Sequence, residues 1–480
     1  TKVVKAEGTL VNGKHEGLWK SYFYSGAIEA EEHFTNNLFN GSVIHYHPNG
    51  KISLQGNYVN GREEGDWKEF YNNGQPTVQA IFKDGKRNGV YKEFYSNGKL
   101  SIDGIYKLDV KDGIWKEYFP NGQIKIDGIY DLGARKGAWK EYYANGTLYH
   151  SANYVNGKIE GSVVWNHVTG KPSIQGQYIH GNMDGEWKDF YTSGKVQSVS
   201  HYSDSLENGL FEDYSIKGIK LFSGNYVSGK ADGTWTYFYE NETGTKKSVE
   251  VWSKGKLMAA PEFYSELGVS LDAGTLKDGA GTRNIYYPKG ALLMDIPFDK
   301  GLENGLATSY YENGVIKAEL YYVNGLQDGI MREYYSTGAL ASVTTYENDV
   351  ENGSYKQFNK EGILSAYGFY KKGLEDSLWF EYHANGKIFS EGYFIDGKKE
   401  GQWFEHYDND TLASMGVYVN GKPDGLWTDY YPNGKITAQG YYVDGMKDGL
   451  WKSYHDNGKV SMEGNFVQGY EDGPWKVYFE

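Results

Sequence analysis

The sequence predicts an all-β protein, an elongated repeat array of about 20 antiparallel β-hairpins that form a single twisted meander sheet. Three observations predict this fold. A glycine recurs every 24 residues. Each repeat contains two runs of aromatic and β-branched residues, and Asn-Gly or Asp-Gly turns separate these runs. A fixed short period indicates one supersecondary unit that is copied along an axis and packs mainly against its neighbours. A side chain that recurs in every unit is therefore expected to build the array.

The repeated glycine divides the chain into three segments. It stands at Gly17, Gly41, Gly65, Gly89, Gly113, Gly137, Gly161, Gly185, Gly209, Gly233, Gly281, Gly305, Gly329, Gly353, Gly401, Gly425, Gly449 and Gly473. The phase is disturbed between Asn241 and Gly281, where two residues are gained near Glu242-Thr243-Gly244. We therefore predict hairpin repeats over 1–240, irregular repeats or a bend over 241–300, and hairpin repeats over 301–480.

The unit that starts at Gly425 shows how one hairpin is specified. Pro432-Asn433-Gly434 separates its two strands. Proline favours the first corner of a type I turn, and glycine then takes the left-handed position of a three-residue hairpin with a bulge. In the second strand, Gly440 and Tyr442 share one face. We expect the Gly440 position to leave room for an aromatic ring from a neighbouring strand over bare backbone.

Tryptophan is mainly a residue of the repeat. The position two residues after the repeated glycine contains 11 of the 13 tryptophans. These residues are expected to be structural: Trp19, Trp67, Trp115, Trp139, Trp187, Trp235, Trp379, Trp403, Trp427, Trp451 and Trp475. The Tyr430 and Tyr431 positions point to opposite faces of the first strand, so one aromatic row is expected to remain partly exposed.

Composition and charge exclude several classes of function. The net charge is −14 and no basic stripe is present, so nucleic acid and anionic membranes are not expected partners. No apolar run approaches the roughly 20 residues of a transmembrane helix. The absence of cysteine excludes disulfides, thiolate catalysis and zinc–thiolate sites. No nucleophile elbow, phosphate loop or zinc-protease motif is found, so we predict neither an enzyme nor a cofactor.

Histidines and turn aspartates receive structural interpretations. Tyrosine at the Tyr431 position is replaced by histidine at His47, His167, His383 and His455, and at the Tyr430 position by His406. We therefore interpret these histidines as flat rings that substitute for tyrosine in the packing. A weak metal site at His45 and His47 is the alternative. The loop aspartates Asp184, Asp232, Asp424, Asp448 and Asp472 lack the spacing of calcium loops, and turn formation explains them better. No metal site is predicted.

The places where the repeat fails are the candidate functional sites. In the irregular stretch we single out Trp252, Phe263, Tyr264, Tyr286 and Tyr287 as candidate partner-binding residues. A milder break near Gly161 adds Trp165, which stands outside the tryptophan position. Two interpretations of 241–300 remain open. It is either a tolerated irregular hairpin or bend between regular arrays, or a docking site or hinge.

The repeat unit resembles a known family. The motif Gly-x-Trp-Lys-x-Tyr-Tyr-x-Asn-Gly-Lys, followed by Gly-x-Tyr-x-Asn-Gly-Lys-x-Asp-Gly, is similar to the bacterial variant of the MORN repeat (membrane occupation and recognition nexus). Gly113 to Gly137 and Gly449 to Gly473 show it well. The resemblance implies hairpin arrays that serve as scaffolds and binding surfaces, and bacterial members are often described as antitoxin-like. It also implies a bacterial cell-envelope location, in the periplasm or at the cell surface, with the cytoplasm as the alternative.

These observations lead to one main hypothesis and two alternatives. We expect a non-enzymatic scaffold or adaptor that binds other proteins within a larger complex, such as a bacterial cell-envelope assembly, because aromatic residues favour interfaces. The first alternative is glycan or cell-wall binding, because rows of Trp and Tyr can stack on sugar rings. The second is an antitoxin-like protein that sequesters a toxin.

Overall fold

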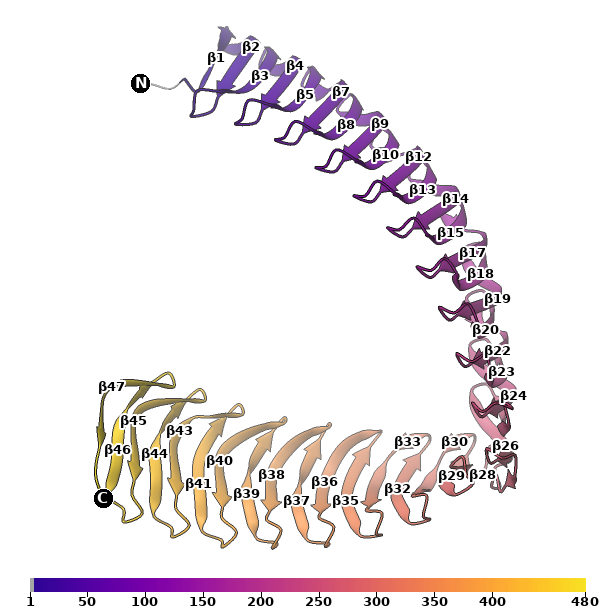
Figure 1. The fold of residues 1–480 in the computed structure, drawn as a ribbon, viewed down its shortest axis with the longest axis vertical. Coiled ribbons are helices and arrows are strands. Elements are labelled where there is room, and N and C mark those ends of the chain that lie inside the picture. The colour runs from indigo at the N-terminus through magenta and orange to yellow at the C-terminus, as the bar shows by residue number, and fades with distance from the viewer. Residues whose placement is uncertain (1–3) are drawn as a thin grey trace. The chain divides into compact units, whose positions relative to one another are not determined.

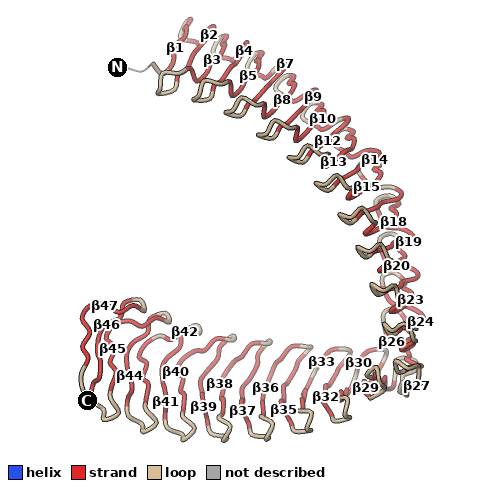
Figure 2. Tube along the Cα trace, in the orientation of Figure 1, coloured by secondary structure: helices blue, strands red, loops and turns tan. Residues whose placement is uncertain are grey.

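The chain forms hairpin after hairpin, as the sequence predicts. The computed structural model describes residues 4–480, and these contain strands and turns but no helix (Figures 1 and 2). The chain divides into two compact units, residues 1–231 and 232–480, which we call unit 1 and unit 2. The all-β array of antiparallel hairpins is thus confirmed.

Unit 1 begins the series of strands. Its strands are β1 (Ala6–Val11), β2 (Lys14–Tyr22), β3 (Ile28–Thr35), β4 (Leu38–Tyr46), β5 (Ile52–Val59), β6 (Arg62–Glu63), β7 (Gly65–Phe70), β8 (Pro76–Lys83), β9 (Lys86–Phe94), β10 (Leu100–Lys107), β11 (Val110–Lys111), β12 (Gly113–Tyr118), β13 (Ile124–Asp131), β14 (Ala134–Tyr142), β15 (Leu148–Val155), β16 (Lys158–Ile159), β17 (Gly161–Asn166), β18 (Pro172–Ile179), β19 (Asn182–Phe190), β20 (Val196–Ser203), β21 (Leu206–Glu207), β22 (Gly209–Tyr214) and β23 (Lys220–Val227). Strand β24 (Lys230–Phe238) contains the boundary between the units.

Unit 2 continues the series. Its strands are β25 (Lys246–Ser253), β26 (Lys256–Tyr264), β27 (Ser270–Leu271), β28 (Gly281–Tyr286), β29 (Leu292–Asp299), β30 (Leu302–Glu303), β31 (Gly305–Tyr310), β32 (Ile316–Val323), β33 (Leu326–Gln327), β34 (Gly329–Tyr334), β35 (Leu340–Glu347), β36 (Val350–Phe358), β37 (Leu364–Lys371), β38 (Leu374–Tyr382), β39 (Ile388–Ile395), β40 (Lys398–His406), β41 (Leu412–Val419), β42 (Lys422–Pro423), β43 (Gly425–Tyr430), β44 (Ile436–Val443), β45 (Met446–Tyr454), β46 (Val460–Val467) and β47 (Tyr470–Val477).

The ladder in unit 2 is interrupted once. Strands β24 to β27 pair in chain order, and β28 to β47 form a 20-stranded antiparallel sheet of their own. The strands are therefore divided between two sheets, whereas the sequence predicts a single one. The interruption lies in the stretch where the 24-residue phase is disturbed.

The two kinds of turn follow from glycine and from its Asn or Asp neighbours. Asp444 and Gly445 have φ values of 51° and 86°, which a two-residue hairpin turn of type I′ requires. At the other end of the hairpin, Gly434 has φ 82°, and its N–H donates to the Tyr431 carbonyl at 2.8 Å. The pairing register shifts between Asp429 and Tyr430, so this turn carries the predicted bulge.

The repeat tryptophans place their rings over a glycine of the preceding strand. A Cβ atom added to Gly128 would lie 2.3 Å from Cδ2 of Trp139, and one added to Gly416 would lie 1.9 Å from Cε3 of Trp427. The ring of Trp139 is 1% exposed, and its indole N–H donates to the Ile129 carbonyl at 3.1 Å. The expected space over glycine is thus filled by tryptophan. We call this side of each sheet the tryptophan face and the opposite side the open face.

The glycine and the tryptophan occur together along the whole chain. Each of the 11 repeat tryptophans has a glycine 11 residues earlier, from Gly8 and Trp19 to Gly464 and Trp475. Repeats with a larger residue in place of the glycine have a smaller side chain in place of the tryptophan. The pair Ala152 and Val163 is an example. The two positions therefore share one volume in the packed face.

Aromatic contacts then connect one repeat to the next. The rings of Tyr442 and Trp451 meet edge to face with centroids 5.2 Å apart, and those of Trp451 and Phe466 are 6.2 Å apart. Long cationic side chains cover some of the tryptophans, as Lys111 does over Trp115 at 3.8 Å. Edge-to-face pairs add to the stabilisation that comes from burying the rings.

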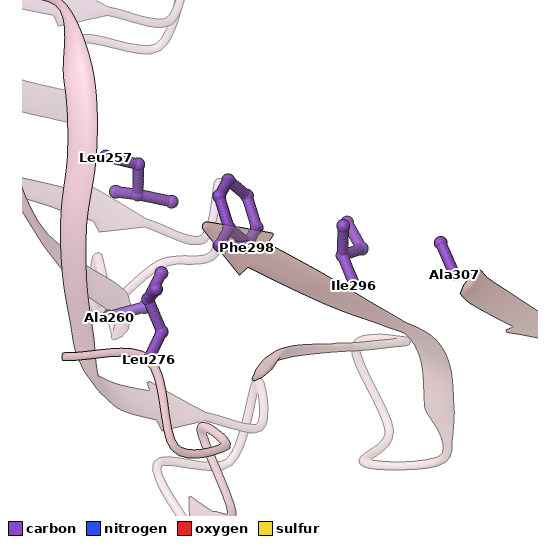
Figure 3. Packing of buried hydrophobic residues seen from close by; sticks show 6 residues of the cluster. All are labelled: Leu257, Ala260, Leu276, Ile296, Phe298 and Ala307. Carbon is purple, nitrogen blue, oxygen red and sulfur yellow. The ribbon is translucent and has the colours of Figure 1, made fainter. Parts of the chain in front are cut away.

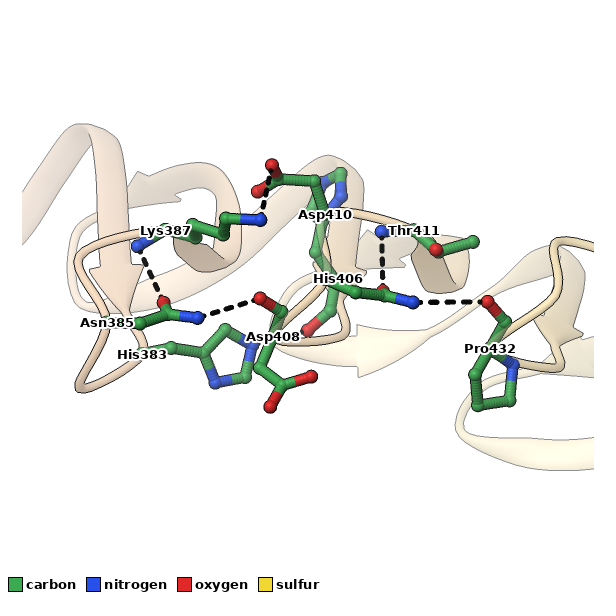
Figure 4. A network of polar contacts seen from close by, with 9 residues as sticks. His383, Asn385, Lys387, His406, Asp408, Asp410, Thr411 and Pro432 are labelled. Atoms are coloured by element: carbon green, nitrogen blue, oxygen red, sulfur yellow. Dashed lines mark hydrogen bonds and ion pairs between the residues drawn. The ribbon is translucent and has the colours of Figure 1, made fainter.

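Hydrogen bonds also connect successive repeats at the turns. Tyr407 donates to the Tyr430 carbonyl at 2.7 Å, and His383 Nε2 donates to the His406 carbonyl at 2.8 Å. Figure 4 shows the neighbouring contacts, in which the Asn385 amide donates to the Asp408 carbonyl at 2.8 Å. Histidine therefore makes the same bond as tyrosine at this position, which confirms its interpretation as a flat substitute.

The first prediction concerns the shared volume of glycine and tryptophan. Gly128→Ala is expected to destabilise the surrounding hairpins by about 1–3 kcal/mol, because the new methyl group overlaps the Trp139 ring. In the double variant G128A/W139V, the two costs should be less than additive by at least about 1 kcal/mol, since a smaller side chain admits the methyl group. Hydrogen exchange of the β13–β15 amides in the full chain measures both effects. Strictly additive costs would contradict the shared volume.

Candidate functional site

The irregular stretch begins with an enlarged turn. The Tyr239 N–H donates to the Thr245 carbonyl at 2.8 Å, whereas Tyr431 in a regular repeat donates to a residue only four positions later. The Tyr239 hydroxyl also donates to the Tyr264 carbonyl, 25 residues later in the chain. In regular repeats the equivalent donor and acceptor are 23 residues apart. The two residues gained here therefore enlarge a turn and leave the connection between repeats intact.

A compact apolar cluster then joins the two ladders of unit 2. Leu257 and Ala260 come from β26, Leu276 comes from the following loop, and Ile296 and Phe298 come from β29. Ala307 of β31 completes the cluster and is fully buried. Figure 3 shows Leu257 beside Phe298, and Leu276 next to Ala260. We call the region from β25 to β31 the joint.

A buried ion pair lies beside this cluster. Glu250 is 3% exposed, and its carboxylate accepts from the Arg283 guanidinium and from the Trp252 indole N–H, the latter at 3.0 Å. Arg283 stands at the tryptophan position of its repeat, and its ladder partner Ile296 stands where most repeats have glycine. The packing of tryptophan over glycine is therefore replaced here by an ion pair and aliphatic side chains.

The loop over 272–280 is tied closely to β28. The N–H groups of Thr275 and Leu276 both donate to the Thr282 carbonyl, at 2.7 and 2.9 Å. A Cβ atom on Gly274 would lie 2.2 Å from that same oxygen, so only glycine allows this approach. The backbone of the joint is therefore held by hydrogen bonds as well as by its apolar cluster.

The candidate residues of the stretch are engaged in these contacts. Phe263 is 3% exposed and packs on the Tyr286 ring at 5.3 Å. Tyr286 and Tyr287 are half-buried, and they donate their hydroxyls to the carbonyls of Asp272 and Tyr310. Half-buried Trp252 packs against the cluster. Tyr264 is also half-buried and donates to Glu262 at 3.0 Å. The structure brings these aromatics together inside the joint and leaves Phe263 almost no surface for a partner.

At the second break of the repeat, near Gly161, the side chains also pack against one another. Trp165 is half-buried and stacks on His150, with ring centroids 4.7 Å apart. Burial lowers the pKa of His150, and the nearby Glu141 carboxylate only partly offsets this effect. Trp165 thus fills space on the tryptophan face, where Val163 replaces the larger ring of other repeats.

Acidic side chains form a row on the tryptophan face, each two residues after the tryptophan position. Several accept a serine hydroxyl, as Glu381 does from Ser390 at 2.7 Å. Asp429 accepts the Trp427 indole N–H at 2.9 Å, and burial raises the pKa of its carboxyl. These carboxylates thus have structural partners. Over residues 4–480 no group of three or more His, Asp or Glu side chains is placed to hold a metal ion.

The alternative metal site at His45 and His47 is not assembled. His45 Nε2 lies 2.9 Å from a Glu32 carboxylate oxygen, and His47 Nε2 donates to the Phe70 carbonyl at 2.8 Å. The turn aspartates behave as the sequence predicts, since Asp424 accepts the Asp444 N–H at 3.1 Å and Asp232 accepts the Lys254 N–H at 3.0 Å.

The open face presents the exposed apolar residues. In unit 2, exposed aliphatic and aromatic side chains recur at equivalent positions of successive repeats and lie on one face because they are paired across strands or are two residues apart. This apolar band contains Leu306, Tyr321, Val323, Leu326, Ile330, Val350, Phe369, Leu374, Tyr393, Ile395, Val419, Leu426, Tyr441, Val443, Met446 and Leu450. Tyr393 and Tyr441 are each 54% exposed.

Sequence reasoning missed this band because it sought exposed rings at the Tyr430 and Tyr431 positions. Both rings are half-buried, and Tyr431 donates its hydroxyl to the Tyr454 carbonyl at 2.8 Å. The signal was present at the residue after the repeated glycine and at the residue before the Tyr442 position. Both are often apolar in unit 2. No helix among residues 4–480 has the length and apolar character needed to cross a membrane.

Comparison with known families identifies the repeat. A family model described as MORN repeat variant matches 16–36, 39–60, 63–84, 87–108, 111–131, 135–156, 183–204, 303–324, 327–348, 375–396, 423–444 and 447–468. These segments make up more than half of the chain and lie in both units. The stretch from 205 to 302, which contains most of the joint, is unmatched. A search of curated proteins finds no match.

The chain also matches solved structures at low identity. The chain is 10% identical to a chain of TcdB2-TccC3-Cdc42, covering 97% of this chain and 28% of that one with a TM-score of 0.14. For TcdB2-TccC3 without its hypervariable C-terminal region, the identity is 10%, the coverage 94% and 32%, and the TM-score 0.15. For the Photorhabdus luminescens Tc holotoxin pore, the identity is 10%, the coverage 94% and 30%, and the TM-score 0.12. The chain thus spans about a third or less of these proteins, and such scores support no conclusion about function.

A second prediction concerns the buried ion pair of the joint. Arg283→Ala is expected to lower the local unfolding free energy by about 3–5 kcal/mol, because Glu250 would keep its charge without a cation. The double variant E250L/R283M should recover most of this loss. The matched control R332A breaks a more exposed pair, with Glu319 at 3.7 Å, and should cost less than about 1 kcal/mol. Hydrogen exchange of β25–β29 reports the effect, and equal costs for R283A and R332A would contradict it.

A third prediction concerns the pH dependence of Asp429. A carboxyl whose folded pKa is raised favours folding at low pH, and this contribution is lost as the pH rises through the folded value. Asp429→Asn keeps an acceptor for Trp427 and should therefore stabilise β43–β45 at pH 7. The difference from the wild type should shrink as the pH falls towards about 4, because at lower pH the carboxyl is protonated in both the folded and the unfolded chain. Thermal unfolding at several pH values tests this, with exposed D456N as the control for net charge. A difference that is independent of pH would contradict it.

Proposed function

The chain belongs to the MORN repeat variant family, and we propose that it is a non-enzymatic scaffold that binds another protein along the open face of its sheet. The observation that supports this most directly is the apolar band of unit 2. Its side chains lie outside the inter-repeat packing, which uses the tryptophan face and the turns.

The extent of the band fits a protein interface. From Leu306 to Leu450 it crosses twelve strand spacings, which amounts to roughly 60 Å at ~4.8 Å per strand. Its side chains stand in two adjacent rows about 7 Å apart along each strand. Exposed apolar residues that recur over this extent are unusual for a surface that stays in water, and they typically mark an interaction site.

The residue types favour a protein over a glycan. Eight of the repeat tryptophans are at most 8% exposed, so the row of rings that a sugar chain would need is already covered by neighbouring repeats. The band itself is mainly Leu, Val and Ile, which gain free energy from burial against other apolar groups. Its exposed aromatics are Tyr321, Phe369, Tyr393 and Tyr441, and tyrosine is enriched among interface residues that dominate binding.

A fourth prediction tests the band. The full chain and its double variant Y393S/Y441S are used as bait in extracts from the source organism, and bound proteins are quantified by mass spectrometry. The wild type should retain a near-stoichiometric partner, and the double variant should retain at least about tenfold less. Envelope and cytosolic extracts are assayed separately, because we propose an envelope location from the resemblance alone.

The control variant is Y24S, which removes a tyrosine that is 93% exposed in a turn of unit 1. It should behave as the wild type does. Absence of any stoichiometric partner, or equal retention by Y393S/Y441S, would count against the proposal. Pelleting with peptidoglycan that depends on Tyr393 and Tyr441 would instead support the glycan alternative.

A further inference from the structure

A separate apolar feature crosses the open face of unit 1. Val90 pairs with Ile105, and Ile114 pairs with Ile129, so these four side chains lie on one face of adjacent strands. Ile81 of β8 extends this row of side chains. A Cβ atom added to the neighbouring Gly89 would lie 2.9 Å from the Cβ of Ile81. We call these five residues the isoleucine stripe. Val90, Ile105, Ile114 and Ile129 are 39–58% exposed, and Ile81 is half-buried.

The stripe is bordered by charged side chains on both sides, and one border also contains the exposed Val110, which pairs with Lys107. On one side run the cross-strand pairs of Lys92 with Asp103 at 3.7 Å and Lys116 with Asp127 at 3.6 Å. On the other side stand three exposed lysines, Lys83, Lys86 and Lys107.

These three lysines form a positive border. No hydrogen bond or ion pair of the side chains of Lys83, Lys86 or Lys107 is found among residues 4–480. The carboxylates near them have other cations, since Asp84 lies 3.9 Å from Arg62, Asp109 lies 2.9 Å from Arg87, and Asp131 lies 2.7 Å from Lys136. Within the described part of the chain, the three lysines therefore have no carboxylate in direct contact.

The shape of the stripe selects among possible occupants. A flat sheet packs through an apolar area several residues wide, which the charged borders exclude. A single added strand pairs with a sheet edge, whereas the stripe lies on a face. An amphipathic helix presents a narrow apolar ridge with charged flanks, and its turns repeat every ~5.4 Å, close to the ~4.8 Å between strands.

The length of the stripe sets the length of its ligand. Four strand spacings separate Ile81 from Ile129, which is about 19 Å, or a helix of about 13 residues. The same position holds Asp66 before Ile81 and Ala138 after Ile129, so the apolar file ends at both sides. A hollow of about 200 Å³ between Ile81 and Val90 offers room for one larger apolar anchor.

We propose that the isoleucine stripe binds an amphipathic helix of a partner protein, with the acidic flank of the helix against Lys83, Lys86 and Lys107. This inference rests on the proposed scaffold function and assigns a class of ligand to unit 1. Attraction across the lysine border should speed association and make binding sensitive to salt.

The test uses a library of helix-forming 14-residue peptides selected on the full chain. Enriched peptides are expected to have apolar residues at i, i+3, i+4 and i+7 and Glu or Asp along one flank of that ridge. Affinities of the enriched peptides are then measured by fluorescence anisotropy. The variant I105S/I114S should weaken binding at least about tenfold, because two central contacts become polar. K83E/K107E should weaken acid-flanked peptides to a similar extent and favour lysine-flanked ones.

The matched control is V155S/I179S, which changes two exposed β-branched residues of unit 1 outside the stripe, 50% and 43% exposed. It should bind as the wild type does. Circular dichroism and thermal unfolding of each variant confirm that the fold is retained. No enrichment, enrichment of peptides without a helical apolar ridge, or binding unaffected by I105S/I114S would overturn the inference. The partner assay with Y393S/Y441S concerns unit 2, so its outcome separates failure of this inference from failure of the scaffold function.

Discussion

The packing of tryptophan over bare glycine is the constraint on which the repeats depend. Each ring occupies the space that a side chain on the preceding strand would need, and in several repeats the indole N–H bonds to the carbonyl that follows that glycine. Because ring and glycine come from successive hairpins, each such contact couples two units of the array. A hairpin alone buries little, and stability of this kind is a sum over neighbouring repeats. This contact also fixes the 24-residue phase of the repeat, because a slip in strand register would separate the ring from its glycine.

The two faces of each sheet therefore contribute differently to the structure. The tryptophan face contains the rings, and the turns contain the tyrosine, histidine and asparagine bonds between repeats. The open face contributes cross-strand ion pairs such as Lys92 with Asp103, but many of its apolar side chains stay exposed. Its residues are therefore free to differ between units. Unit 1 presents a narrow isoleucine stripe with a lysine border, whereas unit 2 presents a wider apolar band with tyrosines. Two different exposed apolar surfaces can thus be built on one repeat.

The joint shows what happens when the constraint is absent. At Ala307 and Ile296, which are 11 residues apart, the ring and the glycine are replaced together, and an aliphatic cluster beside the Arg283–Glu250 ion pair occupies the space. The ladder is interrupted just before these residues. Aromatic residues that look available in the sequence, such as Phe263 and Tyr286, are used inside this packing. An irregular stretch within a repeat array can therefore be stabilised by a core of its own.

The sequence by itself determined the period, the hairpins, both kinds of turn and the exchange of histidine for tyrosine, because each depends on local geometry or on a position shared by many repeats. It also indicated that glycine would receive a ring. Only the tertiary structure decided which rings are covered, because burial depends on strands that pair across the bulge, as Trp139 and Gly128 show. For the same reason it alone placed Glu250 against Arg283, 33 residues later, and left Tyr393 and Tyr441 exposed. Alternation along a strand separates the two faces, but pairing with the neighbours determines which of them is left open to a partner.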